Sequence, residues 1–520
     1  MLARIHSAAT LGLDARILDV EVDASHGLPR FTIVGLPDTT VREARERVRS
    51  ALRNASLPFP GGAVTVNLAP ADFRKSGAAL DLAVAVGLLW TCGVRPADSR
   101  RRVFVGELGL GGELRATRGA LCLALAARDA GFDEIVLPAP CAAEAAAVEG
   151  IAVVGVRHVR EAVEHLIGAR RIPVHAVSEA AGGGASPSVP DFSEIRGQAV
   201  ARRAAEIAAA GGHHLLLAGP PGSGKTMLAR RLPGILPELT RAEAIEVTRI
   251  HSVAGTLPPG GGLVAAPPFR APHHGISAPA LIGGGARPAP GEISLAHRGA
   301  LFLDELAEFR RDALESIRQP LEERRVRVVR VGGACDFPCD VLFVGAMNPC
   351  PCGYLGDSRR PCTCAASERL RYARRVSGPL LDRIDLRVAM PAVPWRELSD
   401  APAGEPSAAI RARVTAARRT AAARRPGRPE FRNADLTPGE LSREAALDAS
   451  GRRILEAAVA RLTLSVRAIH RALRVARTIA DLAESHEIGA RHLSEALALR
   501  GAGLPAACPS DQVDTLAERP

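Results

Sequence analysis

Eight consecutive residues near the middle of the chain have the types and spacing that bind phosphate. The stretch fits the pattern G-x-x-x-x-G-K-[ST] and reads Gly219-Pro220-Pro221-Gly222-Ser223-Gly224-Lys225-Thr226. Its glycines let successive backbone N–H groups point into one concavity for phosphate oxygens at a helix N-terminus. Lys225 would reach the β- and γ-phosphates, and the Thr226 hydroxyl would hold Mg²⁺. The stretch therefore predicts a binding site for a nucleoside triphosphate such as ATP.

Lysine is rare in this chain, which makes Lys225 informative. Of the 67 lysine and arginine residues, only Lys75 and Lys225 are lysines. A phosphate-binding loop needs a compact ammonium group between phosphates, which a planar guanidinium does not replace. The lysine at 225 supports the phosphate-binding interpretation, whereas Lys75 carries the same suggestion more weakly.

Two later apolar runs end in side chains suited to triphosphate chemistry. Residues 299–303 are followed by Asp304, which suits the Mg²⁺ shell, and Glu305, which suits the polarisation of an attacking water. Residues 341–347 lead to Asn348, whose amide could orient that water against the γ-phosphate. We therefore predict catalytic roles for Lys225, Glu305 and Asn348.

Four cysteines follow Asn348 at a spacing typical of a metal site. They form C-x-C, nine intervening residues and a second C-x-C, at Cys350, Cys352, Cys362 and Cys364. Four thiolates from one loop could close a tetrahedral zinc site. C-x-C is tighter than the common C-x₂-C, and Cys335 and Cys339 are competing ligands nearby. Reduced structural cysteines are therefore an equal alternative to bound Zn²⁺.

The elements expected to position these residues form an α/β fold. Residues 215–217 read as a buried strand before the phosphate-binding loop, and residues 227–232 as the first turns of a helix after it. The N-terminal region mixes both periodicities, which predicts an α/β domain without a phosphate-binding loop. Its expected strands are 28–34, 63–68, 103–106, 134–137 and 151–156, and its expected helices are 40–54, 80–89 and 120–130.

Composition suggests where the domains meet. Residues 176–190 are rich in Gly, Ser and Pro, which predicts a linker. The helical pattern near the end has an apolar stripe at Leu464, Ile469, Leu473, Ala476 and Ala480. The predicted order is an N-terminal α/β domain (1–175), the linker, a nucleotide-binding α/β core (191–395), a basic connecting segment (396–435), a helical lid (436–505) and a tail (506–520).

Charge and cysteine usage limit the cellular context. The net charge of +11 and pI near 9.7 favour a polyanionic partner, while only 3% aromatic residues supply few platforms for base stacking. Neither a long uncharged apolar run nor a signal-peptide core is evident, so we expect a cytoplasmic protein without a membrane partner. Ten cysteines, several in C-x-C pairs, favour thiols or metal ligands in a reducing compartment.

Longer motifs resemble a known family. They are Arg270-Ala271-Pro272-His273-His274, Gly283-Gly284-Gly285, Pro290 to His297, Leu301 to Leu306, Asn348 to Gly353 and Gly378 to Asp385. Together they resemble the magnesium-chelatase-like AAA+ ATPases of the ComM/YifB type, over nearly the whole chain. The resemblance implies a bacterial, homo-hexameric ATPase that uses ATP and Mg²⁺. It further implies a DNA helicase that acts on branched or single-stranded DNA in homologous recombination and natural transformation.

The resemblance also assigns roles to two arginines. Arg383, in L-L-D-R-I-D, resembles the arginine finger that enters the neighbouring subunit's nucleotide site. Arg467 resembles the sensor 2 arginine of the helical lid.

At the N-terminus, Arg74 to Asp81 resembles the nucleophile region of Lon-type protease domains, but Ala79 stands where the serine would fall. A Ser-Lys peptidase would lack its nucleophile, so this Lon-like domain would serve to build a ring or guide DNA.

An arginine-rich stretch is the expected DNA contact. Residues 324–333 alternate arginine with valine and end in Gly-Gly, which predicts a β-hairpin. In related ring motors a hairpin at this place faces the central pore, where Arg327 and Arg330 would follow a phosphate backbone. The equal alternative is an edge strand protected by charge. The arginine-dense helix at 411–425 is a second candidate, or a solvated face.

Three functions remain open from the sequence. The first is an ATP-driven motor that moves DNA branches, the second a magnesium-chelatase ATPase subunit, and the third an ATP-dependent protease or protein-remodelling factor. The missing serine disfavours the third. The N-terminal domain, judged to lie outside the chelatase pattern, and the absence of a D-x-S-x-S motif after the lid disfavour the second. Basicity and the arginine hairpin favour the first.

Overall fold

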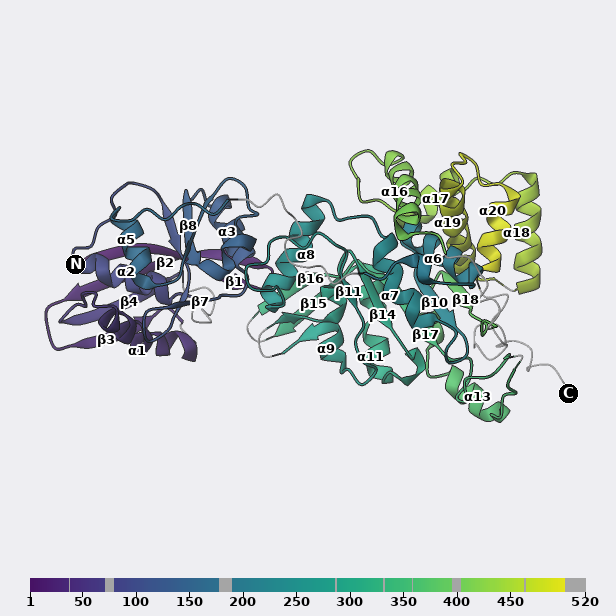
Figure 1. Ribbon diagram of the computed structural model, residues 1–520, viewed down its shortest axis with the longest axis horizontal. Coiled ribbons are helices and arrows are strands. Elements are labelled where there is room, and N and C mark those ends of the chain that lie inside the picture. The colour runs from purple at the N-terminus through teal and green to yellow at the C-terminus, as the bar shows by residue number, and fades with distance from the viewer. Residues whose placement is uncertain are drawn as a thin grey trace.

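The computed structural model shows an elongated molecule with a β-sheet in each half and a group of helices at the C-terminal end (Figure 1). It describes residues 1–36, 38–70, 79–176, 189–285, 288–330, 333–357, 359–394, 404–462 and 464–500. The two sheets have separate hydrophobic cores. Lys75 and most of the Lon-like motif lie outside the described residues.

The N-terminal sheet has seven strands in the order β3-β4-β2-β1-β5-β8-β9. Its strands are β1 (Leu2–Leu11), β2 (Asp14–Ser25), β3 (Arg30–Val34), β4 (Ala63–Ala69), β5 (Arg102–Phe104), β8 (Glu134–Pro138) and β9 (Ala152–Val156). The last five confirm the sequence expectation to within about two residues. The long central hairpin β1–β2 was not predicted, because small or polar Ala3 and Ser7 face inward beside Ile5 and break the apolar alternation.

Helices cover both faces of this sheet. Within β8, Val136 belongs to one hydrophobic cluster while Ile135 and Leu137 belong to the other, so the two clusters lie on opposite faces. The first cluster includes α1 (Thr39–Asn54), α2 (Asp81–Thr91) and α5 (Val159–Leu166), and the second includes α3 (Ala120–Asp129). The three helices predicted from the sequence are confirmed. Asp81, fully buried, accepts hydrogen bonds from Arg47 and is a structural ion-pair partner.

The second sheet has five strands in the order β11-β14-β17-β10-β18, and every pairing is parallel. The strands are β10 (Leu215–Ala218), β11 (Phe269–Arg270), β14 (Ala300–Leu303), β17 (Leu342–Met347) and β18 (Leu386–Ala389). Helix α7 (Lys225–Ile235) follows the phosphate-binding loop. The strand and helix predicted around that loop are confirmed. Because the strands run in one direction, the loops after β10, β14 and β17 meet at one edge.

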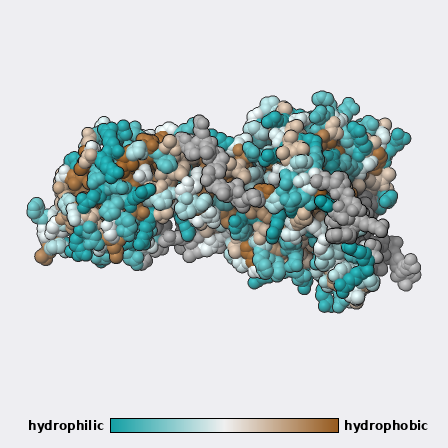
Figure 2. All heavy atoms as spheres, viewed as in Figure 1, coloured by the Kyte–Doolittle hydropathy of each residue, from teal (hydrophilic) through white to brown (hydrophobic). Residues whose placement is uncertain are grey.

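The C-terminal helices pack beside this sheet (Figure 1). They are α16 (Ser407–Ala423), α17 (Pro438–Glu444), α18 (Ala449–Leu462), α19 (Val466–Leu482) and α20 (Ala490–Ala498). The predicted stripe lies on and just before α19, where Ala476 and Ala480 are buried. None of the helices among the described residues is long and apolar enough to cross a membrane. On the face shown in Figure 2, hydrophilic residues predominate and hydrophobic ones form small groups.

Helix α16 lies within the segment expected to be basic and connecting, and it is packed against other helices of the fold. It packs against α6 (Ala199–Gly211), α7 and α19, with Val414 and Ala421 buried. Arg418 donates to the carbonyl of Ala209, and Arg424 pairs with Asp481 at 2.7 Å. These guanidinium groups neutralise or cap interior groups, so the interpretation of 411–425 as a solvated or DNA-contacting face is wrong for Arg418 and Arg424.

The N-terminal half docks on α8 (Arg241–Ala254) of the second half, with α3 as the main contact. The buried carboxyl of Glu144 lies 3.2 Å from the Ser252 hydroxyl across this contact. Burial raises the pKa of Glu144 to about 7, even though that hydroxyl favours the charged form. At the tip of the β1–β2 hairpin, the Leu13 carbonyl accepts a hydrogen bond from Arg249. The two halves are therefore joined by side chains from both.

Candidate nucleotide-binding site

The phosphate-binding loop lies between β10 and α7, where its glycines are needed. Gly222 and Gly224 have φ of +77° and +92°, in the left-handed region that favours glycine. A β-carbon at Gly219 would lie 2.1 Å from the carbonyl oxygen of Met390, just after β18. The loop therefore bends tightly and approaches the neighbouring strand end closely. Its open backbone leads directly into the N-terminus of α7, where phosphate binds favourably.

Lys225 is buried at the first position of α7 and turns back into the loop. Its Nζ donates to the carbonyls of Gly219 at 2.6 Å and Pro220 at 2.9 Å, and lies 3.3 Å from Oδ1 of Asn348. Burial lowers the pKa of Lys225, and the nearby Asp304 carboxylate opposes this shift. The structure thus brings together Lys225 and Asn348, which are separated by 123 residues in sequence.

Thr226 and Asp304 form the part of the site suited to Mg²⁺. The Thr226 hydroxyl donates to Oδ2 of Asp304 at 2.6 Å, which joins the start of α7 to the end of β14. A hydroxyl and a carboxylate are hard oxygen ligands, and Mg²⁺ binds such groups together with phosphate oxygens. The donor set therefore fits Mg²⁺.

Glu305 has a conformation that few residues adopt. Its φ is +53°, and its backbone N–H donates to Oδ1 of Asp304 at 3.0 Å. The half-exposed carboxylate lies 3.4 Å from Nδ1 of His274, a residue that follows β11 at the same edge of the sheet. Such strained backbone is common where function fixes a side chain. Sequence reasoning used His274 only as part of a family motif and missed this contact.

Gln198 is a second residue whose role the sequence did not indicate. It precedes α6 with φ of +50°, and its amide donates to the carbonyls of Ser223 at 3.1 Å and Pro391 at 2.7 Å. The side chain thereby ties the phosphate-binding loop to the segment after β18. Its place directly after Gly197, in a turn before a helix, is the only local signal.

Arg383 and Arg467 lie away from this chain's own phosphate-binding loop. Arg383 comes just before β18, where the N–H of Asp385 donates to the carbonyl of His214 at the start of β10. This is the opposite edge of the sheet from the loop. Arg383 pairs there with Glu322 at 2.6 Å, and Arg467 lines the same small pocket as Arg383 and Arg471. The structure brings the two predicted arginines near each other.

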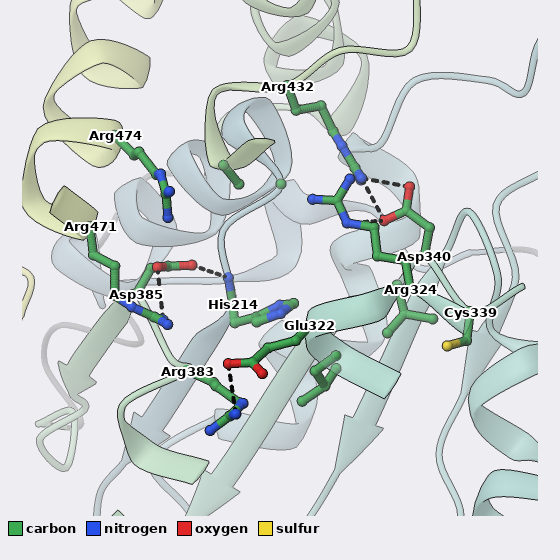
Figure 3. Close-up of a pocket in the computed structure, with 14 residues that line it drawn as sticks. His214, Glu322, Arg324, Cys339, Asp340, Arg383, Asp385, Arg432, Arg471 and Arg474 are labelled. Carbon is green, nitrogen blue, oxygen red and sulfur yellow. Dashed lines mark hydrogen bonds and ion pairs between the residues drawn. The ribbon is translucent and has the colours of Figure 1, made fainter. Parts of the chain in front are cut away.

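A polar cavity of about 250 Å³ adjoins Arg383 (Figure 3). Its charged lining comprises Arg324, Arg383, Arg432, Arg471, Arg474, Glu322, Asp340 and Asp385. All three carboxylates are already paired, since Arg471 lies 3.3 Å from Asp385, Arg432 lies 2.5 Å from Asp340, and Glu322 pairs with Arg383. The cavity nevertheless has more guanidinium groups than carboxylates, which favours an anionic ligand.

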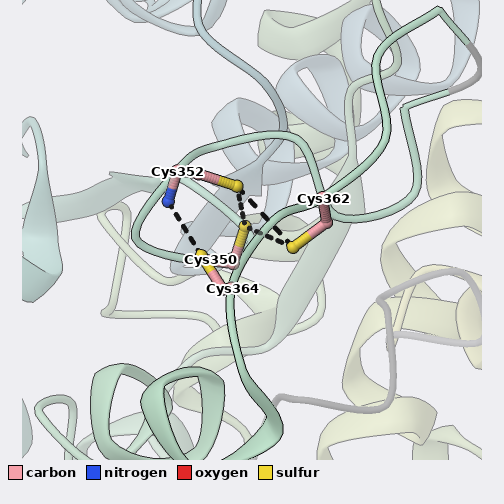
Figure 4. Close-up of side chains that lie close together, drawn as sticks. All are labelled: Cys350, Cys352, Cys362 and Cys364. Carbon is pink, nitrogen blue, oxygen red and sulfur yellow. Dashed lines mark hydrogen bonds between the residues drawn. The ribbon is translucent and has the colours of Figure 1, made fainter.

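The four predicted cysteines lie together in one cluster (Figure 4). Their sulfur atoms are all within 4.8 Å of one another, and Cys350 Sγ lies 3.3 Å from Cys352 Sγ and 3.6 Å from Cys362 Sγ. The backbone N–H of Cys352 donates to Cys364 Sγ at 3.3 Å. Cys335 and Cys339 are not members of the cluster, so the competition considered from the sequence does not arise.

The arginine-rich stretch forms the predicted β-hairpin, from β15 (Arg325–Arg330) and β16 (Gly333–Pro338). Val326 and Val328 are buried on one face, while the side chains of Arg325 and Arg327 are 65% and 70% exposed on the other. Arg327 lies 3.3 Å from Asp336 of β16. The hairpin therefore presents arginine to solvent on one face. The side chain of Arg330 lies outside the described residues.

Comparisons with known proteins agree with this geometry. Residues 191–398 match the family described as magnesium chelatase, subunit ChlI, and residues 404–500 match the subunit ChlI C-terminal family. Competence protein ComM of Haemophilus influenzae is 42% identical over 504 residues, 96% of this chain and 97% of that protein. The chain belongs to the ComM/YifB-type family of magnesium-chelatase-like proteins. The uncharacterized protein YifB of Escherichia coli is 41% identical over 506 residues, again 96% and 97% of the two chains.

Membership in the ComM/YifB-type family fixes the fold class as a P-loop AAA+ core with a C-terminal helical region, and indicates an ATPase. ATP and Mg²⁺ are the ligands that such a family implies, and the donor set around Lys225 and Thr226 fits both.

One argument from the sequence, that the N-terminal domain lies outside the chelatase pattern, is wrong. Residues 20–140 match the family described as subunit ChlI of Mg-chelatase, so the N-terminal domain does not set this chain apart from the chelatase subunit.

We expect Lys225→Ala to weaken ATP binding by roughly tenfold or more, about 1.4 kcal/mol or more, because the phosphate-binding loop loses its ammonium group. Titration with a fluorescent ATP analogue measures this affinity. Met227→Ala, two residues further along α7 and partly exposed, is the matched control and should bind as the parent does. Unchanged affinity in Lys225→Ala would remove the loop from the nucleotide site.

We expect Glu305→Gln to bind ATP normally but to lower the hydrolysis rate on the order of 10²- to 10⁴-fold, the range for losing a positioned general base. Phosphate release at saturating ATP measures the rate. Glu308→Gln, one turn further and paired with Arg375, controls for loss of charge near the site. Hydrolysis at the parent rate in Glu305→Gln would place the base elsewhere.

Proposed function

We propose that the protein is a homo-hexameric AAA+ motor that hydrolyses ATP to move branch points in DNA, as a helicase in homologous recombination and natural transformation. The observation that carries the proposal is the division of the ATP machinery between two edges of one sheet. Lys225, Asp304, Glu305 and Asn348 gather at one edge, and Arg383 lies at the other. A complete site then needs two subunits.

The strand length supports this division. Each of the four residues of β10 advances the chain by about 3.3 Å, so the two edges are separated by roughly 13 Å. A guanidinium group that pairs with Glu322 at the far edge cannot contact phosphate on its own chain's loop. Arg383 and Arg467 would instead stabilise charge on a nucleotide held by the next subunit. Contacts in which one surface binds a different surface of the next copy form rings when the rotation from one copy to the next closes.

Three observations support DNA as the substrate. The hairpin β15–β16 exposes Arg325 and Arg327, while Val326 and Val328 anchor it to the core. Exposed guanidinium groups of this kind are suited to contact the phosphate oxygens of nucleic acid. The chain carries a net charge of +11. A relative that shares most of its length is named competence protein ComM, which connects the family with natural transformation.

We assign ATP and Mg²⁺ as cofactors, Lys225, Glu305, Asn348, Arg383 and Arg467 as catalytic residues, and Arg327 and Arg330 as DNA contacts. The cysteine cluster is assigned one Zn²⁺, because four sulfur atoms within 4.8 Å form a donor set typical of zinc. The bacterial cytoplasm is the proposed location.

A chelatase ATPase subunit is the second candidate, since all three family matches carry the chelatase description. ATP hydrolysis by the pure protein distinguishes the candidates when it is measured with a four-way DNA junction, with casein, or with a porphyrin-binding chelatase subunit. The motor proposal requires that the junction stimulates hydrolysis most. Stimulation by the chelatase subunit alone would favour the second candidate.

The composite site predicts recovery of activity on mixing two inactive variants. In mixed rings of Arg383→Ala and Lys225→Ala, about one in four interfaces joins an intact loop to an intact arginine. We expect each variant alone to be inactive and the equimolar mixture to regain about a quarter of the parent ATPase rate. Mixing Lys225→Ala with Glu305→Gln is the control, because both defects lie at the same edge and no recovery should follow. No recovery in the first mixture would mean that Arg383 does not act across subunits.

The hairpin predicts a separation of activities in the double variant Arg327→Ala with Arg330→Ala. Basal ATP hydrolysis should persist, because the hairpin is not part of the nucleotide site. DNA stimulation and branch migration should be lost, and the log–log salt dependence of DNA binding should flatten by about one unit for each phosphate contact removed.

Filter binding across salt concentrations and a junction-dissociation assay measure these effects. The control variant replaces Arg452 and Arg453, two exposed arginines of α18, with Ala. Branch migration at the parent rate in the hairpin variant would make the hairpin a charged edge without contact to DNA.

A further inference from the structure

The cysteine cluster has dimensions that fit a single tetrahedral ion. Four sulfur ligands at about 2.3 Å from a Zn²⁺ ion lie about 3.8 Å from one another. Three of the sulfur–sulfur distances are 3.3 to 3.6 Å, and all lie within 4.8 Å, which approaches this value. They leave room for one ion and not for a larger cluster. All four cysteines are free thiols, so no disulfide competes for them.

The first arm of the cysteine loop leads directly from the nucleotide site. Asn348 follows β17, its amide oxygen lies 3.3 Å from Lys225 Nζ, and fully buried Cys350 comes two residues later. Further along the arm, Gly353 approaches the phosphate-binding loop so closely that a β-carbon there would lie 2.7 Å from Cδ of Pro221. The arm therefore contacts the loop at two places, through an amide and through backbone.

The second arm returns to the same asparagine. Cys362 and Cys364 precede α13 (Ala366–Ala373), and the buried Tyr372 on this helix hydrogen-bonds the backbone of Asn348. The segment between Asn348 and α13 forms no helix or strand among its described residues. The thiol contacts and the Arg360 guanidinium on the Tyr354 ring, 4.2 Å from its centroid, join the two arms.

We infer that one Zn²⁺ at Cys350, Cys352, Cys362 and Cys364 closes this loop and thereby holds Asn348 against Lys225 and Gly353 against Pro221. Zinc is then a positioning element of the ATP site, although it does not touch the nucleotide. Loss of the ion leaves both β-sheets folded, because neither hydrophobic core depends on the loop, but it releases Asn348. The coupling rests on the proposed ATPase function, whereas the binding of zinc does not.

The metal content of the full-length protein tests whether zinc is bound at the cysteine cluster. We expect about one Zn²⁺ per chain by elemental analysis in the parent and none in Cys350→Ser with Cys352→Ser. Cys92→Ser, at an exposed cysteine of the N-terminal half, is the matched control and should keep its zinc. Replacement of zinc by Co²⁺ should give the intense visible absorption of a tetrahedral thiolate site. A metal-free parent, or zinc retained by the double variant, would overturn the site.

ATP hydrolysis tests the coupling. The zinc-free variant should lose on the order of 10²-fold in kcat, the lower end of the range for losing one preorganised polar group. Adding Asn348→Ala to the zinc-free variant should lower kcat little further, because both changes remove the same contact between Asn348 and Lys225. The far-ultraviolet circular dichroism should match that of the parent. Hydrolysis at the parent rate without zinc would overturn the coupling while leaving the metal site intact.

Reversible removal of the ion keeps the test decisive if the serine variant does not fold. The parent is stripped with a zinc-selective chelator in excess Mg²⁺, and Zn²⁺ is then restored. The rate should fall and recover with zinc content. A rate that does not follow zinc content contradicts the coupling. If the loaded parent contains zinc but hydrolyses no ATP, the proposed ATPase function fails and the zinc site stands.

Discussion

The parallel direction of five short strands is the constraint on which the rest of this structure depends. It places the ends of β10, β14 and β17 at one edge, so that Lys225, Asp304 and Asn348 meet although their sequence positions are far apart. It also places Arg383 at the opposite edge. In the proposed motor, site assembly and subunit assembly would both follow from this geometry, because Arg383 would reach a phosphate-binding loop only on another copy.

Internal ion pairs explain much of the arginine content. Asp340, just after β16, pairs with Arg432 at 2.5 Å and Arg324 at 3.5 Å. Burial alone would raise the pKa of Asp340, yet these guanidinium groups hold it below its ordinary range. Arg432 lies between α16 and α17, so this pair ties the base of the hairpin to the helical region. Removing one partner would leave a buried charge unpaired, which is costly.

The sequence predicted the elements whose signal is local. The phosphate-binding loop is a recognisable motif, and the strands before Asp304 and Asn348 are short apolar runs. The sequence therefore predicted all three. Strand β1 was missed because Ala3 and Ser7 occupy inward positions without a strong apolar signal. The burial of α16 was missed because its arginine partners are remote, with Glu206 separated from Arg413 by 207 residues. The contacts of Gln198 and His274 likewise depend on loops that meet only in the folded chain.

The N-terminal half also contacts the hairpin β15–β16. At the tip of β1–β2, Gly12 approaches so closely that a β-carbon would lie 2.8 Å from Sγ of Cys335 on β16, and the Leu13 carbonyl accepts from Arg249 of α8. The hairpin β15–β16 thus contacts the N-terminal sheet through Cys335 and the helical region through Asp340. Because close-packed contacts resist gradual deformation, a shift of the hairpin must move or break one of them. In the proposed motor, a DNA contact at the exposed arginines would therefore be transmitted to both halves of the chain, which would give the N-terminal domain a mechanical role without a catalytic serine.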